Sequence, residues 1–225
     1  TRDIYDQLKQ RKTVNGVSLE DIIQSGVCLP AGAYRLGVFC GDPESYKTFR
    51  ELLFPIIKQH HKVSYNPSRT LQRFRTNMNP EALLKTRLDT NRDYILYTRM
   101  RLARSISGFR FAPCMDRSDR RKVERLVQDC VNTWDGKYIS VSEMSNKQHH
   151  ELVKLQYLFP DPDEYLISAG LGRDWPDARG IYCDTWDNTP NVLIWCNYQD
   201  HVWIISNNKG GDVQGVFTRL SQANA

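Results

Sequence analysis

The sequence lacks several features that would place it in a specialised class. No apolar run approaches the roughly 18 residues of a membrane span, and the first residues show no apolar signal-peptide core. Its six cysteines include no Cys-x-x-Cys pair, so neither a zinc site nor a small disulfide framework is indicated. A Walker-type phosphate loop and internal repeats are also missing. We therefore expect a cytoplasmic protein with reduced thiols, no metal site and no membrane partner.

What the sequence does contain is an ample core and an uneven charge. With 225 residues, of which 40% are apolar, the chain has the size of one large or two small domains. Between Arg69 and Lys122, fourteen basic residues stand against five acidic ones. Such a stretch suits phosphates, an acidic protein surface or nucleic acid, or it is a solvated face with local ion pairs. No base-stacking motif accompanies the arginines, so we expect no nucleic-acid partner.

The first part of the sequence has helical patterns. Ser18 and Asp21 resemble a capping box before one helix. Asp42 and Pro43 form the start signal of a second helix that runs to residue 61, with Pro55 as a kink. Residues 61–93 show weak periodicity and many turn formers, which is typical of a long connection between domains.

The second part alternates strand and helix signals. A strand is predicted from residue 93 to 106, and Ser118 is predicted to cap a helix whose apolar stripe includes Leu126 and Cys130 as core. Ser145 is predicted to cap a helix over 146–159, and Asp212 to cap the last one. Between them, VLIWCN and VWIISN read as a hairpin with the tip WCNYQDH.

The strand over 93–106 presents Arg99 and Arg101 on one face, because alternate side chains of a strand point the same way. Two neighbouring guanidinium groups repel each other unless an anion or a carboxylate lies between them. The pair is therefore either a phosphate-binding fork or a buried salt-bridge pair, and the pattern alone favours neither.

Several separate motifs, in the same order, resemble the phosphagen kinases, the guanidino kinases that include arginine kinase and creatine kinase. IYDQLKQRKTVNGVSLEDIIQSGV and GDPESYKTF are similar to the helical N-terminal domain of that family. TRMRLARSISGF, RDWPDARGI, the hairpin tip and IISNNKGGDVQGVF are similar to the first part of its catalytic domain.

The resemblance implies an α+β fold, with a small all-α N-terminal domain followed by part of an antiparallel sheet flanked by helices. It implies a helical domain over 1–65, a linker over 66–93 and the first part of the catalytic-type domain over 94–225. The family transfers the γ-phosphoryl group of Mg-ATP to a guanidino nitrogen, which requires phosphate-binding arginines, Mg²⁺ and a carboxylate that orients and deprotonates the substrate.

By the same resemblance, Arg99 and Arg101, with neighbouring Thr98, match the nucleotide phosphate site. The hairpin tip departs from the family, which has two successive glutamates where this chain has Tyr198 and Gln199. Gln199 stands at the position of the base, and an amide cannot take a proton near neutral pH. Trp203 replaces a phosphate-binding arginine, so no intact catalytic residue is expected.

The substrate-specificity loop also differs. It is longer than in arginine kinases, and its equivalents here include Leu36, Val38 and Phe39. Phe39 replaces a tyrosine and lacks the hydroxyl. In addition, the sequence ends before the remaining strands of the family's sheet, as either a fragment or a naturally short chain would. If these residues are all that folds, we expect open sheet edges that recruit missing residues of the same polypeptide, a second copy or a host assembly.

Three hypotheses follow. The first is an inactive or impaired homologue, a pseudoenzyme, that serves as a structural or interaction module in a host assembly, for which an acidic surface such as a cytoskeletal filament would suit the basic stretch. The second is an active ATP:guanidino phosphotransferase with an altered mechanism. The third is a sensor that holds Mg-ATP without turnover. On the first hypothesis, Mg-ATP binding is weak or lost.

Overall fold

The computed structural model describes residues 2–28, 37–62, 77–83, 88–186 and 189–225. The chain divides into two compact units, each built from several segments of the sequence. The first contains Thr1–Asn77, Phe109–Met115 and Asp163–Arg173, and the second contains Met78–Gly108, Asp116–Pro162 and Asp174–Ala225. The predicted linker over 66–93 lies partly outside the described residues. None of the described helices has both the length and the hydrophobicity needed to cross a bilayer.

The first unit is helical. Its helices are α1 (Arg2–Leu8), α2 (Leu19–Cys28), α3 (Ser45–Thr48), α4 (Arg50–His61) and α8 (Glu164–Ser168), with the 3-10 turn η2 (Ala112–Cys114). Apolar side chains from these helices and the turn after α1 form its core, namely Leu8, Val17, Leu19, Ile22, Phe49, Leu53 and Cys114. The capping box is present, because the Ser18 N–H donates to Asp21 Oδ2 at 2.9 Å and the Asp21 N–H donates to Ser18 Oγ at 3.3 Å.

The predicted continuous helix up to residue 61 is interrupted. Asp42 Oδ1 accepts a hydrogen bond from the Ser45 N–H at 2.8 Å, and α3 begins there. At Phe49 the backbone leaves helical geometry, with φ −114° and ψ 30°, and α4 begins at the next residue. Phe49 is fully buried, so the break allows its ring to enter the core of the unit.

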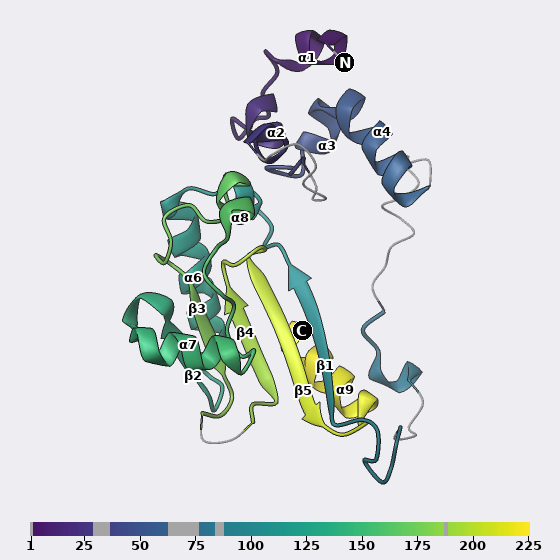
Figure 1. The fold of residues 1–225 in the computed structure, drawn as a ribbon, viewed down its shortest axis with the longest axis vertical. Helices are drawn as coiled ribbons and strands as arrows, with labels where there is room; N and C mark the ends of the chain where they lie inside the picture. The colour runs from purple at the N-terminus through teal and green to yellow at the C-terminus, as the bar shows by residue number, and fades with distance from the viewer. Residues whose placement is uncertain (1, 29–36, 63–76, 84–87, 187–188) are drawn as a thin grey trace. The chain divides into compact units, whose positions relative to one another are not determined.

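The second unit contains a five-stranded antiparallel sheet with the order β1-β5-β4-β3-β2 (Figure 1). The strands are β1 (Tyr97–Arg104), β2 (Lys137–Ser140), β3 (Gly180–Cys183), β4 (Val192–Cys196) and β5 (Val202–Lys209). The helices are α6 (Arg117–Val131), α7 (Asn146–Lys154) and α9 (Val213–Asn224), with the 3-10 turns η1 (Pro80–Ala82) and η3 (Val141–Glu143). A helical first unit and an antiparallel sheet with helices confirm the predicted α+β fold.

The two faces of the sheet are covered differently. Helix α9 packs against β1 and β5, and α6 packs against β2 and β4, so these helices cover one face. On the opposite face, Leu152 of α7 joins Ile181, Leu193 and Trp195 in a buried cluster. In Figure 1, α7 lies in front of the sheet and α9 behind it. Helix α7 lies over β3 rather than over β1, and no described helix lies in front of the β1-β5 half of the sheet.

Three sequence-based details are corrected by the structure. Helix α6 is capped by Asp116, whose Oδ1 accepts from the Asp119 N–H at 2.8 Å, and not by Ser118. In the predicted apolar stripe of α6, Leu126 is 47% exposed and Cys130 is also exposed, so neither belongs to the core. Ser145 does cap α7, but that helix ends at Lys154 because Gln156 takes a left-handed conformation with φ 58°.

Candidate functional site

Strand β1 places Arg99 and Arg101 on the face of the sheet that α7 leaves open. In the β1-β5 ladder Arg99 pairs with Asn207, Arg101 with Ile205 and Ala103 with Trp203. Paired residues of an antiparallel ladder point to the same face. Both arginines therefore share a face with Trp203.

Thr98 lies on the other face of β1, since neighbouring residues of a strand alternate. Its Oγ1 donates to the carbonyl oxygen of Gly210 at 2.7 Å. This bond ties the start of β1 to the turn between β5 and α9. The structure thus does not bring Thr98 together with the two arginines that the sequence grouped with it.

Arg99 is a half-buried cation without a hydrogen-bonding partner for two of its nitrogen atoms. Its Nε and Nη2 are buried and form no hydrogen bond within the described part of the chain. The guanidinium carbon lies 5.7 Å from the centre of the Trp195 ring, in cation–π geometry. Burial, followed by the charge of Arg101, lowers the pKa of Arg99. No described carboxylate forms an ion pair with either arginine, so the salt-bridge alternative finds no support.

The hairpin tip is closed by a left-handed residue. Asn197 has φ 53°, and its N–H donates to the carbonyl oxygen of His201 at 2.9 Å. His201 is fully buried, and its Nδ1 accepts the N–H of Ile106 at 2.9 Å. These bonds fix both ends of the five-residue tip between β4 and β5.

Aromatic rings, rather than carboxylates, fill the tip. The Tyr198 ring stacks on Phe159 with 4.6 Å between ring centres, and it meets Trp195 edge-on at 5.9 Å. Trp203 lies 6.2 Å from Trp195, its partner in the β4-β5 ladder. Trp175 contacts Phe159 at 5.9 Å. We call these five residues, Phe159, Trp175, Trp195, Tyr198 and Trp203, the aromatic cluster.

The tip contains one carboxylate, that of Asp200, and it accepts a hydrogen bond from Trp203. The indole Nε1 donates to Asp200 Oδ2 at 3.0 Å. Burial raises the pKa of Asp200, while the Trp203 hydrogen bond and His201 oppose the rise. Gln199, beside it, is exposed. The position that the resemblance assigns to a base is therefore a solvent-facing amide next to a carboxylate bound by an indole.

A polar network behind the tip holds it in place. The Asn197 Nδ2 donates at 2.8 Å to the carbonyl oxygens of both Arg120 and Ala178. The buried Arg179 Nε donates to the carbonyl oxygen of Asn197 at 3.0 Å, and burial lowers the pKa of Arg179 to about 10. The tip is thus tied to α6 and to the loop 174–179 at once.

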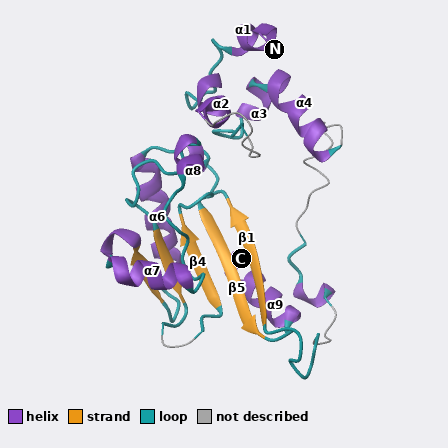
Figure 2. Ribbon diagram, in the orientation of Figure 1, coloured by secondary structure: helices purple, strands orange, loops and turns teal. Residues whose placement is uncertain are grey.

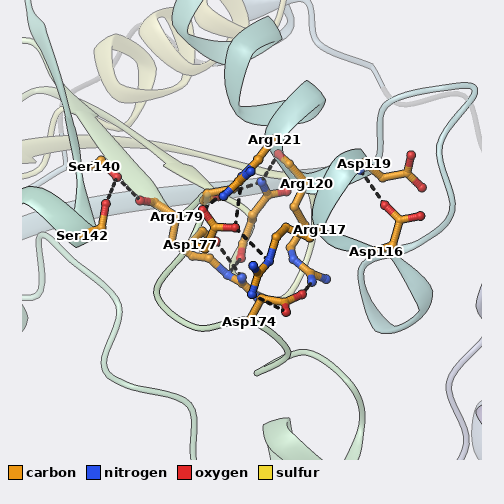
Figure 3. Close-up of polar contacts among 12 residues, drawn as sticks. Asp116, Arg117, Asp119, Arg120, Arg121, Ser140, Ser142, Asp174, Asp177 and Arg179 are labelled. Atoms are coloured by element: carbon orange, nitrogen blue, oxygen red, sulfur yellow. Dashed lines mark hydrogen bonds and ion pairs between the residues drawn. The ribbon is translucent and has the colours of Figure 1, made fainter.

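Ion pairs fix this loop to α6. Figure 3 shows Arg117, Arg120 and Arg121 of the helix converging on Asp174 and Asp177. Arg120, 2% exposed, pairs with Asp174, and Arg117 contacts the same carboxylate at 3.0 Å. Sequence reasoning missed this network. The sequence did contain a signal for it. The motif RDWPDARG carries two aspartates, whose charge complements that of Arg117, Arg120 and Arg121 on the predicted helix.

The residues expected in the substrate loop belong to the first unit. The Phe39 N–H donates to the Ile22 carbonyl oxygen at 2.9 Å, and its ring lies 5.8 Å from that of Tyr165. Val38 packs against the core of that unit. Leu36 lies outside the described residues. In the part of the chain that the structure describes, no three His, Cys, Asp or Glu side chains could share a metal ion.

Comparisons with known proteins agree on one family. Residues 1–58 match the model "ATP:guanido phosphotransferase, N-terminal domain", and residues 120–225 match "ATP:guanido phosphotransferase, C-terminal catalytic domain". Creatine kinase M-type of Rattus norvegicus is 37% identical over 228 residues, covering 98% of this chain and 58% of the relative. Creatine kinase M-type of Tetronarce californica is 38% identical, with the same coverage. The chain thus spans about three fifths of the length of these curated relatives.

Solved structures give the same result. The crystal structure of lombricine kinase matches with a TM-score of 0.85 and 30% identity, over 100% of this chain and 60% of that one. The duplicated taurocyamine kinase from Schistosoma mansoni, with bound transition state analog components, matches with a TM-score of 0.86 and 30% identity, over 100% of this chain and 31% of that one.

Proposed function

Because this chain belongs to the phosphagen (ATP:guanidino) kinase family, we propose that it is a catalytically impaired or inactive member that serves as a structural or interaction module. One observation carries the proposal. At the hairpin tip, the position that the resemblance assigns to the catalytic carboxylate is Gln199, an exposed amide, and the neighbouring carboxylate of Asp200 accepts the indole N–H of Trp203.

The chemistry explains why these changes matter. Phosphoryl transfer to a guanidinium needs a group that orients the substrate and accepts its proton, and an amide does neither as a carboxylate does. A general base typically contributes about 10²–10⁴-fold to the rate. Trp203 carries no charge to offset that of the transferring group, so electrostatic stabilisation is reduced as well.

The residues fit Mg-ATP only in part. Arg99 has two buried nitrogen atoms without partners, and Arg101 is exposed beside it, so both could hold phosphate oxygens. When bound, Mg-ATP supplies the phosphoryl group and the metal charge. The aromatic cluster offers no ionisable group apart from the Tyr198 phenol, so we expect binding to be weak or lost and substrate-dependent turnover to be absent.

An interaction role suits the residues that remain. On α6, Arg117, Arg121, Lys122 and Arg125 are exposed, and although carboxylates pair with Arg117, Arg121 and Lys122, cations outnumber the carboxylates of the helix itself. An acidic protein surface, such as that of a cytoskeletal filament in the cytoplasm, has the complementary charge. We propose such a host assembly as the partner. Its contacts would weaken as salt rises, because screening shortens the reach of surface charges.

The test is a phosphotransfer assay on the full-length protein with Mg-ATP and a panel of guanidino compounds, together with calorimetric titration of Mg-ATP. We expect no substrate-dependent ADP formation and little or no heat. A matched control is Arg101→Met, which removes one phosphate-binding candidate at an exposed position. Turnover at rates typical of the family, abolished in this variant, would overturn the proposal.

A second candidate function, an active phosphotransferase with an altered base, is favoured by one observation. Burial raises the pKa of Asp200, which makes its ionised form a stronger base. Asp200→Asn discriminates the two functions, since asparagine keeps an acceptor for the Trp203 indole but takes no proton. If the full-length protein transfers phosphoryl groups and this variant does not, the second function is correct.

A further inference from the structure

The first unit contains a cleft that the catalytic motifs do not involve. Its volume is about 430 Å³, which is within the size range of small-ligand sites. It lies between the turn after α1 and the junction of α3 and α4, and it is lined by Arg11, Lys12, Glu44, Lys47, Thr48 and Arg50. Four of these six side chains are cationic, whereas only one is acidic.

The two arginines share a single carboxylate. Arg11 Nη1 lies 3.0 Å from Glu51 Oε2, and Arg50 Nε lies 3.4 Å from Glu51 Oε1. Arg11 also donates to the Thr48 carbonyl oxygen at 3.0 Å. One glutamate therefore serves two guanidinium groups, each of which has further donors to offer.

The two lysines have no such partner. Lys12 and Lys47 are exposed, and neither forms an ion pair with any carboxylate that the structure describes. The acidic residue of the lining, Glu44, is engaged elsewhere, because its Oε2 accepts the Val14 N–H at 2.7 Å. The cleft thus carries excess positive charge.

Three of the backbone amides around the cleft already donate within the chain. The N–H groups of Lys47 and Thr48 donate to the Glu44 carbonyl oxygen at 2.9 and 3.0 Å, and that of Arg11 donates to Leu8 at 2.9 Å. Compact phosphate sites commonly rely on free backbone amides at a nest or a helix start. Here the donors are side-chain cations spread over two chain segments, which suits several separated negative charges better than one compact oxyanion.

We propose that this cleft binds an acidic peptide segment, with carboxylates that contact Lys12 and Lys47 and the outer donors of Arg11 and Arg50. The surface differs from the basic face of α6 and lies in the other unit, so the inference holds whether or not the protein transfers phosphoryl groups. Association would be led by charge and fall with rising ionic strength.

The experiment titrates a hexaglutamate peptide into the full chain and, separately, inorganic pyrophosphate. Binding is followed by calorimetry at low salt and again at ten times that salt concentration. The variant Lys12→Glu/Lys47→Glu should weaken peptide binding at least about tenfold, because each reversal replaces an attraction by a repulsion at contact distance. The milder Lys12→Gln/Lys47→Gln, which keeps the long polar stems, should give an intermediate loss.

The matched control is Lys137→Glu/Lys147→Glu, which makes the same change in net charge at two exposed lysines of the second unit. We expect it to leave peptide affinity within about twofold of the parent protein at the higher salt concentration, because neither lysine lines the cleft and salt screens charges that do not contact the peptide. Equal losses in both charge-reversed variants, or no peptide binding at all, would overturn the proposal. Pyrophosphate binding as tight as peptide binding, with the same dependence on Lys12 and Lys47, would overturn the assignment to a peptide.

Discussion

Strand β1 and the hairpin tip lie on the same sheet, yet they differ in what they preserve. On β1, Arg99 and Arg101 remain as cations without a carboxylate partner in the described chain. At the tip, the Tyr198 ring stacks on Phe159, and the Asp200 carboxylate accepts the indole N–H of Trp203. Strand β1 therefore presents unpaired positive charge within the described chain, as an anion-binding site does, whereas the tip is packed with aromatic rings, as a hydrophobic core is.

The difference teaches that the contacts that fix the backbone of the tip are separate from the side chains that the tip presents. Asn197, Arg179 and the ion pairs of α6 hold the tip in a defined conformation, whatever side chains it presents. The Asn197 side chain uses both hydrogens of Nδ2 in this network, while its Oδ1 is buried without a hydrogen-bond partner in the described chain. The conformation of the tip therefore depends on this network more than on the side chains of Tyr198 and Gln199.

The largest effect is expected when the side chain that holds the tip, that of Asn197, is removed. Asn197→Ala should lower the free energy of unfolding by about 3 kcal/mol, because it removes the two hydrogen bonds from Nδ2 to backbone carbonyl groups and places alanine in a left-handed conformation. Chemical denaturation of the parent protein and the variant measures this change in the free energy of unfolding. Asn197→Gly, which tolerates the positive φ, should be less destabilising than alanine. An effect as small as that of exposed Asn191→Ala would mean that the network does not hold the tip.

A glutamate introduced at the tip should leave stability nearly unchanged at position 199 but lower it at position 198. Tyr198→Glu should destabilise the protein by about 3 kcal/mol, since it removes the stack on Phe159 and places a charge among rings. Gln199→Glu, at an exposed position, should change stability by no more than about 0.5 kcal/mol. Thermal unfolding of both variants checks the contrast, and equal destabilisation would show that the cluster is not packed as described.

On β1, removing a cation should increase stability while it weakens anion binding. Arg99→Met should stabilise the protein by about 1 kcal/mol, because a half-buried charge without hydrogen-bonding partners is replaced by an apolar chain of similar length. Arg101→Met, at an exposed position, should leave stability unchanged within about 0.5 kcal/mol. Denaturation with and without pyrophosphate measures both effects. A loss of stability in Arg99→Met would mean that the cation–π contact with Trp195 outweighs the cost of burying the charge, which would contradict the prediction.

The smallest effect is a pH dependence at the tip. The pKa of Asp200 is raised in the folded protein, chiefly by burial, so folding favours its protonated form. Its contribution to stability is therefore present below the unfolded pKa and is lost as pH rises through the folded value. Asp200→Asn should be more stable than the parent at neutral pH, and the difference should disappear at acidic pH. A difference that grows on acidification would contradict the burial of this carboxylate.

Local rules in the sequence predicted much of the secondary structure. The caps at Ser145 and Asp212 were found because side chains of this type accept the first free N–H groups of a helix. The cap of α6 was misplaced because Asp116 and Ser118 carry equivalent signals two residues apart. Helix periodicity could not show the break at Phe49, which depends on tertiary packing of that ring.

The site was predictable where it follows alternation along a strand. Arg99 and Arg101 share a face because β1 is a regular strand, and the same rule places Thr98 on the opposite face, where it bonds Gly210. The aromatic cluster was not predictable. Phe159, Trp175 and Tyr198 come from separate segments, and only the fold brings their rings together.

The indole rings of Trp195 and Trp203 lie close to the arginine pair, so their optical signals should report on an anion bound there. Trp195 and Trp203 lie 6.2 Å apart at 30°, close enough for their excited states to couple, and the Arg99 guanidinium lies over the Trp195 ring. An anion that draws this guanidinium away would alter the emission of Trp195 and the near-ultraviolet dichroism of the pair. Occupancy of the site can therefore be followed in the unlabelled protein by its intrinsic fluorescence.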